Sequence, residues 1–249
     1  VPIQGSEGTF QPDIAAIKGA ITPHTKAVLI NSPNNPSGVV YTEESIKQLC
    51  KVLQECKNNG QTIYLISDEP YRELVFGGVK VPYIMNYYAD SIVCYSFSKS
   101  LSLPGERIGY IAVNPAMGNA GEVYAAVCGA GRALGYVCAP SLFQLIIPRV
   151  IGKTSDISVY ERNRDVLSAA LQSYGYEVVK PDGAFYLFVK SLEPDSDAFA
   201  ERAKEHELLI VSAKSFGVEG YVRISYCVSP DMISRSLPAF KALAESYGK

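Results

Sequence analysis

Lys99 is the residue of this chain best placed for covalent chemistry. It ends the segment Ser96-Phe97-Ser98-Lys99, directly after the strand-like residues 91–95, and Arg107 follows soon after. A lysine amine near hydroxyl donors and a fixed positive charge has what covalent binding of a phosphorylated aldehyde requires. Most lysines are simply solvated, so this interpretation of Lys99 needs support from other segments.

Two other strand-like runs also end in polar residues. The apolar residues 26–30 break into the Asn- and Pro-rich residues 31–38, and the β-branched residues 62–67 end at Asp68-Glu69-Pro70-Tyr71. In an open α/β sheet, ligands bind outside the carboxyl ends of the strands. We therefore expect one rim of the sheet to bring together Asn35, Asp68, Tyr71, Ser96 and Lys99.

These residue types suit a pyridine ring that carries an aldehyde, a phenolic oxygen and a phosphate. A carboxylate such as Asp68 would keep the ring nitrogen protonated, which makes the ring an electron sink. Asn35 and Tyr71 would donate hydrogen bonds to the phenolic oxygen. Hydroxyl and guanidinium donors for the phosphate are supplied by Ser96, Ser98 and Arg107.

With these segments the sequence resembles the fold-type I, pyridoxal-phosphate-dependent aminotransferases of class I and II. The matching segments, in chain order, are NNPSG at 34–38, SDEPY at 67–71, SFSK at 96–99 with Arg107 and Gly109, and YVRIS at 221–225. Four motifs in the right order over most of the chain are far more specific than any one of them.

The resemblance also implies a role for each matching residue. It makes Lys99, Asp68 and Tyr71 catalytic, with Lys99 as the lysine that forms a Schiff base with pyridoxal 5'-phosphate. It places Arg223, together with Asn35, on the α-carboxylate of the substrate, which suits the bidentate fork of a guanidinium. The residues implied for cofactor binding are Asn35, Asp68, Tyr71, Ser96, Ser98, Lys99 and Arg107.

The activity implied is transfer of an amino group from an amino acid to a 2-oxo acid. Two alternatives stay open: a carbon-sulfur lyase that catalyses β-elimination, and a non-catalytic aminotransferase-like domain of a transcription regulator. The expected partners are the amino acid and 2-oxo acid substrates and a second copy of the chain in a homodimer. The expected location is the cytoplasm, without a nucleic-acid or membrane partner.

The chain departs from the family pattern in three places. Ser37 stands where threonine is more usual, and Ser212-Ala213 stands where many relatives carry Pro-Gly. The first residues, including 9–14, resemble a segment from the middle of the family's large domain. We therefore expect the family's N-terminal portion, with its phosphate-binding glycine loop and its ring-stacking aromatic residue, to be missing from this sequence.

Composition is that of an ordinary globular chain. The 249 residues are 47% hydrophobic and carry a formal net charge of -2, so charge gives no argument for binding nucleic acid or an anionic membrane. No apolar run approaches the ~18 to 20 residues of a membrane span. The six cysteines have no paired spacing and are expected to be reduced and buried, and the two histidines lack metal-ligand spacing.

Periodicity indicates a βαβ unit in the first half of the chain and a separate α+β domain in the second. The family resemblance implies an α/β fold with a three-layer, mostly parallel sheet in the large domain and a smaller α+β C-terminal domain. We place the large, cofactor-binding domain at 1–152, incomplete relative to the family, and the small domain at 153–249. A helix is predicted over 42–58, where apolar residues recur at helical spacing. The elements predicted in the second domain are helices over 158–174, 197–207 and 230–247, and strands over 177–179, 185–189, 208–211 and 221–225.

Overall fold

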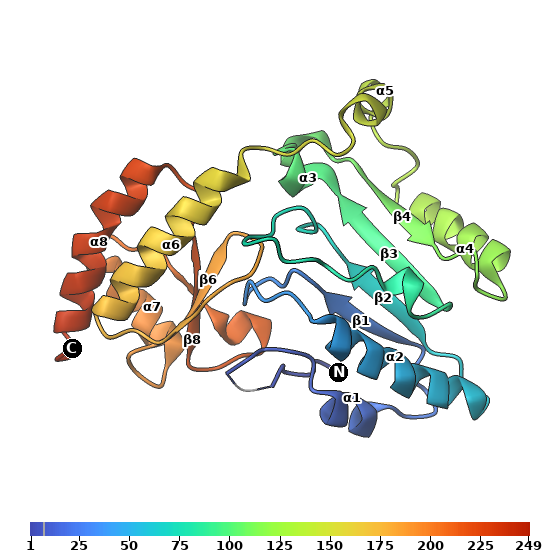
Figure 1. Cartoon of the computed structure of the whole chain (residues 1–249), viewed down its shortest axis with the longest axis horizontal. Helices are drawn as coiled ribbons and strands as arrows, with labels where there is room; N and C mark the ends of the chain where they lie inside the picture. The colour runs from blue at the N-terminus through green and yellow to red at the C-terminus, as the bar shows by residue number, and fades with distance from the viewer. Residues whose placement is uncertain (7) are drawn as a thin grey trace.

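The computed structural model describes residues 1–6 and 8–249 and contains two four-stranded sheets. The first sheet has the order β1-β2-β3-β4, with β1 (Ala27–Asn31), β2 (Tyr64–Asp68) and β3 (Ser91–Ser96) parallel and β4 (Gly109–Val113) antiparallel. Figure 1 shows this sheet in the right half of the view and the C-terminal elements in the left half. The structure confirms an α/β fold with a mostly parallel sheet.

Helix α2 (Glu43–Asn58) connects β1 to β2 and confirms the helix predicted there. Its first turn is capped by Thr42, whose side-chain oxygen accepts from the backbone N–H of Ser45 at 3.1 Å. Leu49 and Leu53 of α2 are fully buried against the sheet, in a cluster that also contains Ile63. The shorter helix α1 (Ile14–Ala20) packs beside α2.

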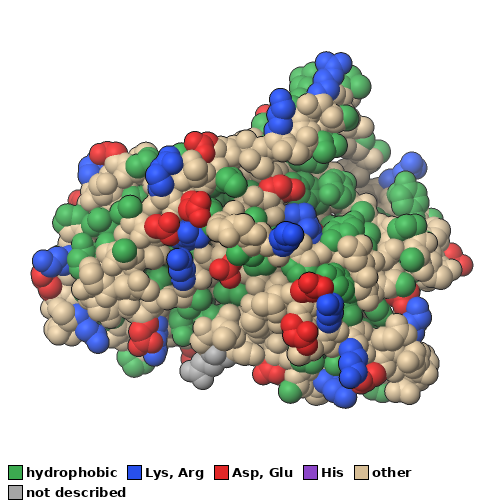
Figure 2. Space-filling model, viewed as in Figure 1, with side chains coloured by type: hydrophobic (Ala, Val, Ile, Leu, Met, Phe, Trp, Pro, Cys, Tyr) green, Lys and Arg blue, Asp and Glu red, His purple; other side chains and the backbone are tan. Residues whose placement is uncertain are grey.

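Short helical segments flank β3. The 3-10 turn η1 (Ile84–Asn86) precedes β3, helix α3 (Phe97–Ser100) follows it directly, and a second 3-10 turn, η2 (Pro104–Glu106), comes before β4. Helices α4 (Ala120–Ala133) and α5 (Ser141–Val150) bury little: α4 has no buried side chain and α5 only Ile147. Figure 2 shows hydrophobic side chains at the surface where α4 and α5 lie in Figure 1.

The second sheet is antiparallel, with the order β5-β6-β8-β7. Its strands are β5 (Val178–Val179), β6 (Tyr186–Lys190), β7 (Val211–Ser212) and β8 (Tyr221–Ser225). It packs with helices α6 (Ile157–Ser173), α7 (Ser196–Lys204) and α8 (Pro230–Glu245) around a second hydrophobic cluster, and the turn η3 (Ala213–Phe216) precedes β8. The boundary at 152–153 falls between α5 and α6 and stays a prediction.

Two expectations for this part of the chain were wrong in detail. The strand predicted over 208–211 begins only at Val211, because the N–H of Leu208 bonds the carbonyl of Ala203 in the turn that closes α7. The same turn ends α7 at Lys204, before the predicted end at 207. Leu208 and Ile210 are buried all the same, so the apolar pattern reported burial rather than strand pairing.

Gly38 joins the two sheets. Its carbonyl accepts from the N–H groups of Asp182 and Gly183, each at 3.0 Å, and the N–H of Ala184 bonds the carbonyl of Leu74 at 2.8 Å. Gly38 has φ +73°, and a Cβ there would lie 2.3 Å from the Cβ of Pro181. Only glycine fits this close approach, which seats the segment before β6 against the loop that follows β1, while the Ala184–Leu74 bond seats it against the loop that follows β2.

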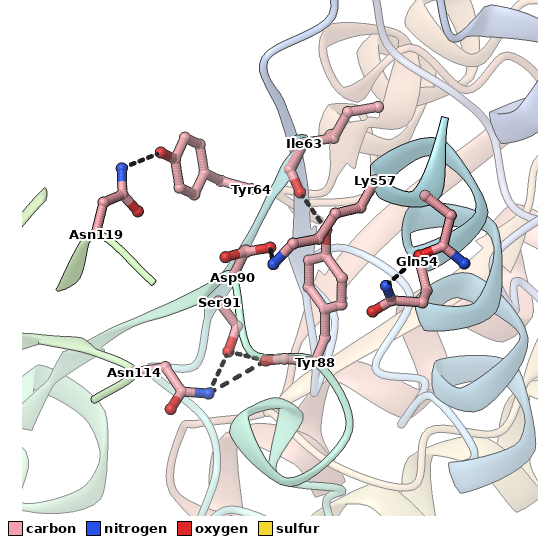
Figure 3. Close-up of polar contacts among 10 residues, drawn as sticks. Gln54, Lys57, Ile63, Tyr64, Tyr88, Asp90, Ser91, Asn114 and Asn119 are labelled. Atoms are coloured by element: carbon pink, nitrogen blue, oxygen red, sulfur yellow. Dashed lines mark hydrogen bonds and ion pairs between the residues drawn. The ribbon is translucent and has the colours of Figure 1, made fainter. Parts of the chain in front are cut away.

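A set of polar side chains lies at the amino ends of β2 and β3, which we call the amino-end network (Figure 3). Lys57 of α2 forms an ion pair with Asp90, whose side chain is only 3% exposed. The Asn114 amide donates to Ser91 Oγ at 3.1 Å and to two backbone carbonyls, and the Tyr88 hydroxyl donates to the carbonyl of Ile63. The charged and polar groups of this network therefore have partners within the chain.

The cysteines differ from expectation. All six are unpaired, but only Cys50 is buried, whereas Cys128, Cys138 and Cys227 are exposed. Cys128 belongs to α4, which buries no side chain, so its apolar sequence context did not predict burial. Within the described part of the chain, no helix is long and apolar enough to cross a membrane, and no three His, Cys, Asp or Glu side chains gather as a metal site.

Candidate active site

The site is built on the carboxyl ends of the three parallel strands. In the sheet register Asn31, the last residue of β1, pairs with Asp68, the last residue of β2, and Asp68 pairs with Cys94 of β3. The loop after β1 carries Asn35, and α3 after β3 carries Lys99. Chain direction and register thus bring these polar residues to one rim, as expected for an open α/β sheet.

Asp68 is a half-buried carboxylate. Its Oδ2 accepts from Asn31 Nδ2 at 3.1 Å. Burial and the neighbouring Glu69 raise the pKa of Asp68, while the Asn31 bond lowers it. Glu69 is itself buried and forms an ion pair with Arg72, so the charge next to Asp68 is partly neutralised.

Lys99 lies against aromatic rings. Its Nζ is 5.9 Å from the ring centroid of Tyr71 and 5.5 Å from that of Phe185. The two rings meet edge to face, with centroids 5.4 Å apart. The amine is thus held on an apolar surface, where an ammonium gains cation–π attraction but less hydration than in water.

Tyr71 is buried and remains protonated at neutral pH. Its hydroxyl lies 3.4 Å from the hydroxyl of Tyr186 on β6. Burial, followed by the contact with Tyr186, raises the pKa of Tyr71 far above its ordinary value. A phenol held in this way is a hydrogen-bond donor rather than a base.

Arg223 comes from the second sheet and meets the loop after β1. Its Nη1 donates to Asn35 Oδ1 at 3.0 Å, although the two residues are 188 positions apart. The guanidinium carbon lies 4.5 Å from the ring centroid of Tyr186 and 4.8 Å from that of Phe216. The rings and the amide together restrict a side chain that is otherwise flexible.

Ser96 and Ser98 lie beside Lys99 at the start of α3, and the Arg107 segment runs next to them, with Arg107 Nη1 donating to the carbonyl of Pro104 at 2.8 Å. Ser96 Oγ donates to Ser98 Oγ at 2.7 Å and accepts from the Ser98 N–H, which caps α3. Pairing of Ser96 with Gly109 places the Arg107 segment next to α3. Arg107 is exposed and has φ +52°, a left-handed conformation that costs about 1–2 kcal/mol in a non-glycine residue. Such backbone strain is found most often at functional sites.

Four residues that contact the predicted ones were not predicted from the sequence: Asn31, Phe185, Tyr186 and Phe216. Asn31 carried a usable signal, because it ends β1 as Asp68 ends β2. The three aromatic residues carried none, since a ring against Lys99 or Arg223 looks in sequence like any core residue. The contacts form one chain that runs Asp68, Asn31, Asn35, Arg223, Tyr186, Tyr71, Lys99.

The donor set fits pyridoxal phosphate. Among residues 1–6 and 8–249, the charged groups of Asp68, Lys99 and Arg107 form no ion pair. Charged groups at one rim of the sheet without ion-pair partners suit a ligand that brings charges of both signs, here a ring nitrogen that takes a proton and a phosphate. The assignment of these residues to the cofactor stays a prediction.

Comparison with known families gives a match over nearly the whole chain. The family model for aminotransferases of class I and II matches residues 1–240. The probable aspartate/prephenate aminotransferase of Aquifex aeolicus is 32% identical over 98% of this chain, and the aspartate aminotransferase of Bacillus subtilis is 31% identical over 97%. This chain spans 64% of the length of the first of these relatives and 63% of the second.

Solved structures agree with this match. A crystal structure of an aminotransferase from Eubacterium rectale superposes with a TM-score of 0.97 at 55% identity, covering 100% of this chain and 63% of that one. A tetra mutant of the aspartate aminotransferase of Thermus thermophilus gives a TM-score of 0.80 at 28% identity, covering 96% of this chain and 66% of that one.

Proposed function

The chain belongs to the class I and II aminotransferases, and on this premise we propose that its protein transfers an amino group from an amino acid to a 2-oxo acid. Members of this family depend on pyridoxal phosphate. One observation carries the proposal for this chain: Arg223 of the second sheet bonds Asn35, in the loop that follows β1 of the first sheet, at 3.0 Å. A carboxylate-binding group therefore lies in the same contact chain as Lys99 and Asp68.

Each part of the cofactor has a residue to hold it. Lys99 would hold it covalently, Asp68 would pair with the ring nitrogen, and Asn35 and Tyr71 would donate to the ring oxygen. The phosphate would take hydroxyl and guanidinium donors from Ser96, Ser98 and Arg107. When bound, pyridoxal phosphate supplies a ring that accepts the electron pair left when the α-proton of an amino acid is removed.

Proton transfer falls to the Lys99 amine. The Tyr71 and Phe185 rings, with centroids 5.9 Å and 5.5 Å from Nζ, restrict where the amine can lie. From this position Nζ would take the α-proton of the substrate and later return it. Asp68, as a carboxylate, would stabilise a protonated ring nitrogen, and this role requires that Asp68 be ionised at the working pH.

Substrate binding falls to Arg223. Its planar guanidinium matches a carboxylate bidentately, and the α-carboxylate is common to every amino acid donor. The bond that Arg223 Nη1 donates to Asn35 Oδ1 occupies one edge of the guanidinium. The remaining N–H groups are then available to the substrate, and the Tyr186 and Phe216 rings limit how the group can rotate.

The test is a product analysis on the purified protein loaded with pyridoxal phosphate. A panel of amino acids is supplied with 2-oxoglutarate, and glutamate, pyruvate and ammonia are followed. We expect glutamate in proportion to the donor consumed and no ammonia. Ammonia and pyruvate from cysteine-like donors would instead indicate a lyase, and cofactor binding without any product would indicate a sensor domain.

We also propose a homodimer located in the cytoplasm. Support for the dimer comes from the region of α4 and α5, where large apolar side chains such as Leu134, which follows α4, and Leu145 of α5 are more than 70% exposed. Such a surface is costly in a monomer. Support for the location comes from six unpaired cysteines, the usual state in a reducing compartment. Analytical ultracentrifugation tests the dimer, and imaging of a tagged protein tests the location.

A further inference from the structure

The Asn31 side chain contacts two separate parts of the site. Its Nδ2 donates to the Asp68 carbonyl at 2.9 Å and to Asp68 Oδ2 at 3.1 Å. Its Oδ1 accepts from the backbone N–H of Asn35 at 2.7 Å. Both ends of one short amide are therefore used, one on the carboxylate and the other on the loop that meets Arg223.

Pairing of the β1 and β2 backbones does not by itself require these side-chain bonds. Sheet register already aligns Asn31 with Asp68, so the second bond, to Oδ2, adds nothing to strand pairing. What it does is fix the rotation of the carboxylate, with Oδ2 bound and the other oxygen left for a ligand. The bond from the Asn35 N–H to Asn31 Oδ1 holds the backbone of Asn35 in place, and the side chain of Asn35 contacts Arg223.

We propose that Asn31 is a positioning residue that couples the carboxylate of Asp68 to the Asn35–Arg223 pair, so that the cofactor nitrogen and the substrate carboxylate are bound in one fixed geometry. This inference rests on the proposed function, because it assumes that Asp68 pairs with the cofactor. Asn31 itself touches neither the cofactor nor the substrate in this account.

The charges around Asp68 make the Asn31 donor important. Glu69 and Cys94, and the phenol of Tyr71, are the titratable groups that interact with Asp68. Each of them, when ionised, opposes a negative charge on Asp68. The amide of Asn31 is a neutral donor that favours the ionised carboxylate, and it lowers the pKa of Asp68 against the effects of burial and Glu69.

Asn34 provides a matched control. It lies in the same loop and is also half-buried, and its Oδ1 accepts from the N–H and hydroxyl of Ser37 while its Nδ2 bonds the carbonyl of Asn31. It braces the turn without reaching Asp68 through its side chain. Loss of the Asn34 amide thus reports loop stability, and loss of the Asn31 amide reports the coupling to Asp68.

The experiment measures the dissociation constant of pyridoxal phosphate between pH 5 and 8, without substrate. The variants are Asn31→Ala, Asn31→Asp, Asn34→Ala, Asp68→Ala and the double variant Asn31→Ala/Asp68→Ala. We expect Asn31→Ala to weaken binding about tenfold at pH 7, the usual size for a lost hydrogen bond to a charged group. The acid limb of the pH profile, meaning the pH range in which affinity for the cofactor is lost on acidification, should move to higher pH in this variant, because Asp68 then protonates more easily.

Two further results are expected. Asn31→Asp keeps the acceptor for Asn35 but sets a carboxylate against Asp68, so binding should weaken more than in Asn31→Ala and the acid limb should move further. In the Asp68→Ala background, Asn31→Ala should add less than about twofold, because its partner is gone. Asn34→Ala should leave the acid limb in place.

The outcomes separate the inference from the proposed function. Suppose that Asp68→Ala weakens binding. If the effect of Asn31→Ala is then equally large in the Asp68→Ala background, or if Asn31→Ala does not move the acid limb, Asn31 is not coupled to Asp68 and only this inference is overturned. If Asp68→Ala leaves affinity and pH profile unchanged, the role of Asp68 in the proposed function fails as well. Circular dichroism checks folding, and Asn31→Ser replaces Asn31→Ala should that variant not fold.

Discussion

At the amino ends of β2 and β3, Lys57 and Asp90 neutralise each other, whereas at the carboxyl ends Asp68 and Lys99 form no ion pair with any described residue. Both ends hold polar groups that are at least partly removed from water. In the amino-end network these groups are satisfied within the chain, which favours folding. At the other end charge is kept without a partner, which costs stability and leaves binding capacity for a ligand.

The difference shows how to separate a structural polar cluster from a functional one. Composition does not do it, because both clusters contain Lys, Asp, Asn, Ser and Tyr. The two clusters differ in whether their charged groups have partners within the chain. A cluster whose polar and charged groups all have such partners stabilises the fold, whereas a cluster with unpaired charges can bind a ligand. Substitutions at corresponding residues of the two ends should therefore have opposite signatures.

The largest expected effect is that of Lys99→Ala. Loss of the positioned amine removes both the covalent link and the proton carrier, and we expect turnover to fall by about 10⁴-fold or more. Borohydride treatment followed by denaturation and mass spectrometry should find no cofactor bound to the protein. Lys57→Ala is the control: it should lower the melting temperature and still retain the cofactor. Labelling of Lys99→Ala equal to the parent would refute the assignment.

Asp68→Asn is expected to have the next largest effect. Removing the anionic partner of the ring nitrogen should lower kcat by about 10²-fold or more, as loss of one preorganised electrostatic group commonly does. Asp90→Asn, at the other end of the sheet, should change kcat by less than about twofold, since it contacts no site residue. Steady-state kinetics on the two variants decides this, and equal losses would erase the distinction between the ends.

Arg223→Lys should act mainly on substrate binding. An ammonium cannot reproduce the bidentate fork, so we expect KM for every amino acid donor to rise about tenfold, with a smaller change in kcat. Arg164 is a suitable control, because its guanidinium also lies over an aromatic ring, that of Phe76, but outside the site. Arg164→Lys should shift the melting temperature and leave KM alone. A rise in KM confined to one donor would point to side-chain recognition instead.

The smallest effect is on stability, and its sign differs between the two ends. Because burial and Glu69 raise the pKa of Asp68, the folded protein pays for ionising this carboxyl as pH rises. Asp68→Asn should therefore raise the melting temperature of the cofactor-free protein at pH 7. That gain should vanish as pH falls below the ordinary carboxyl pKa of about 3.9.

Asp90→Asn should do the opposite at neutral pH. It leaves Lys57 without its counter-charge and should destabilise the protein by about 1–2 kcal/mol. Differential scanning calorimetry from about pH 3 to pH 8 measures both variants. A lower melting temperature for Asp68→Asn at pH 7 would contradict the view that the carboxyl end stores unpaired charge.

Much of the fold was readable from local pattern. Helix α2 and strand β8 were predicted within a residue, because helical spacing over 42–58 and the β-branched pattern of 221–225 are local signals. The strand over 208–211 was wrong, because burial in a turn and burial in a strand give the same apolar letters. Burial of Cys128 was wrong because α4 lacks a packed face among the described residues.

The sequence by itself determined the chemistry that is available and its order along the chain. Asn35, Asp68 and Lys99 follow strand-like runs, and the end of a strand is a local property that places each residue at the rim of a parallel sheet. Only the tertiary structure decided which groups meet. The bond from Arg223 to Asn35 spans 188 positions. The Tyr186 ring reaches Arg223 because β6 pairs with β8, and the Phe216 ring reaches it from η3, the turn before β8. Such contacts depend on how two sheets pack, and packing is set by the whole chain rather than by any segment of it.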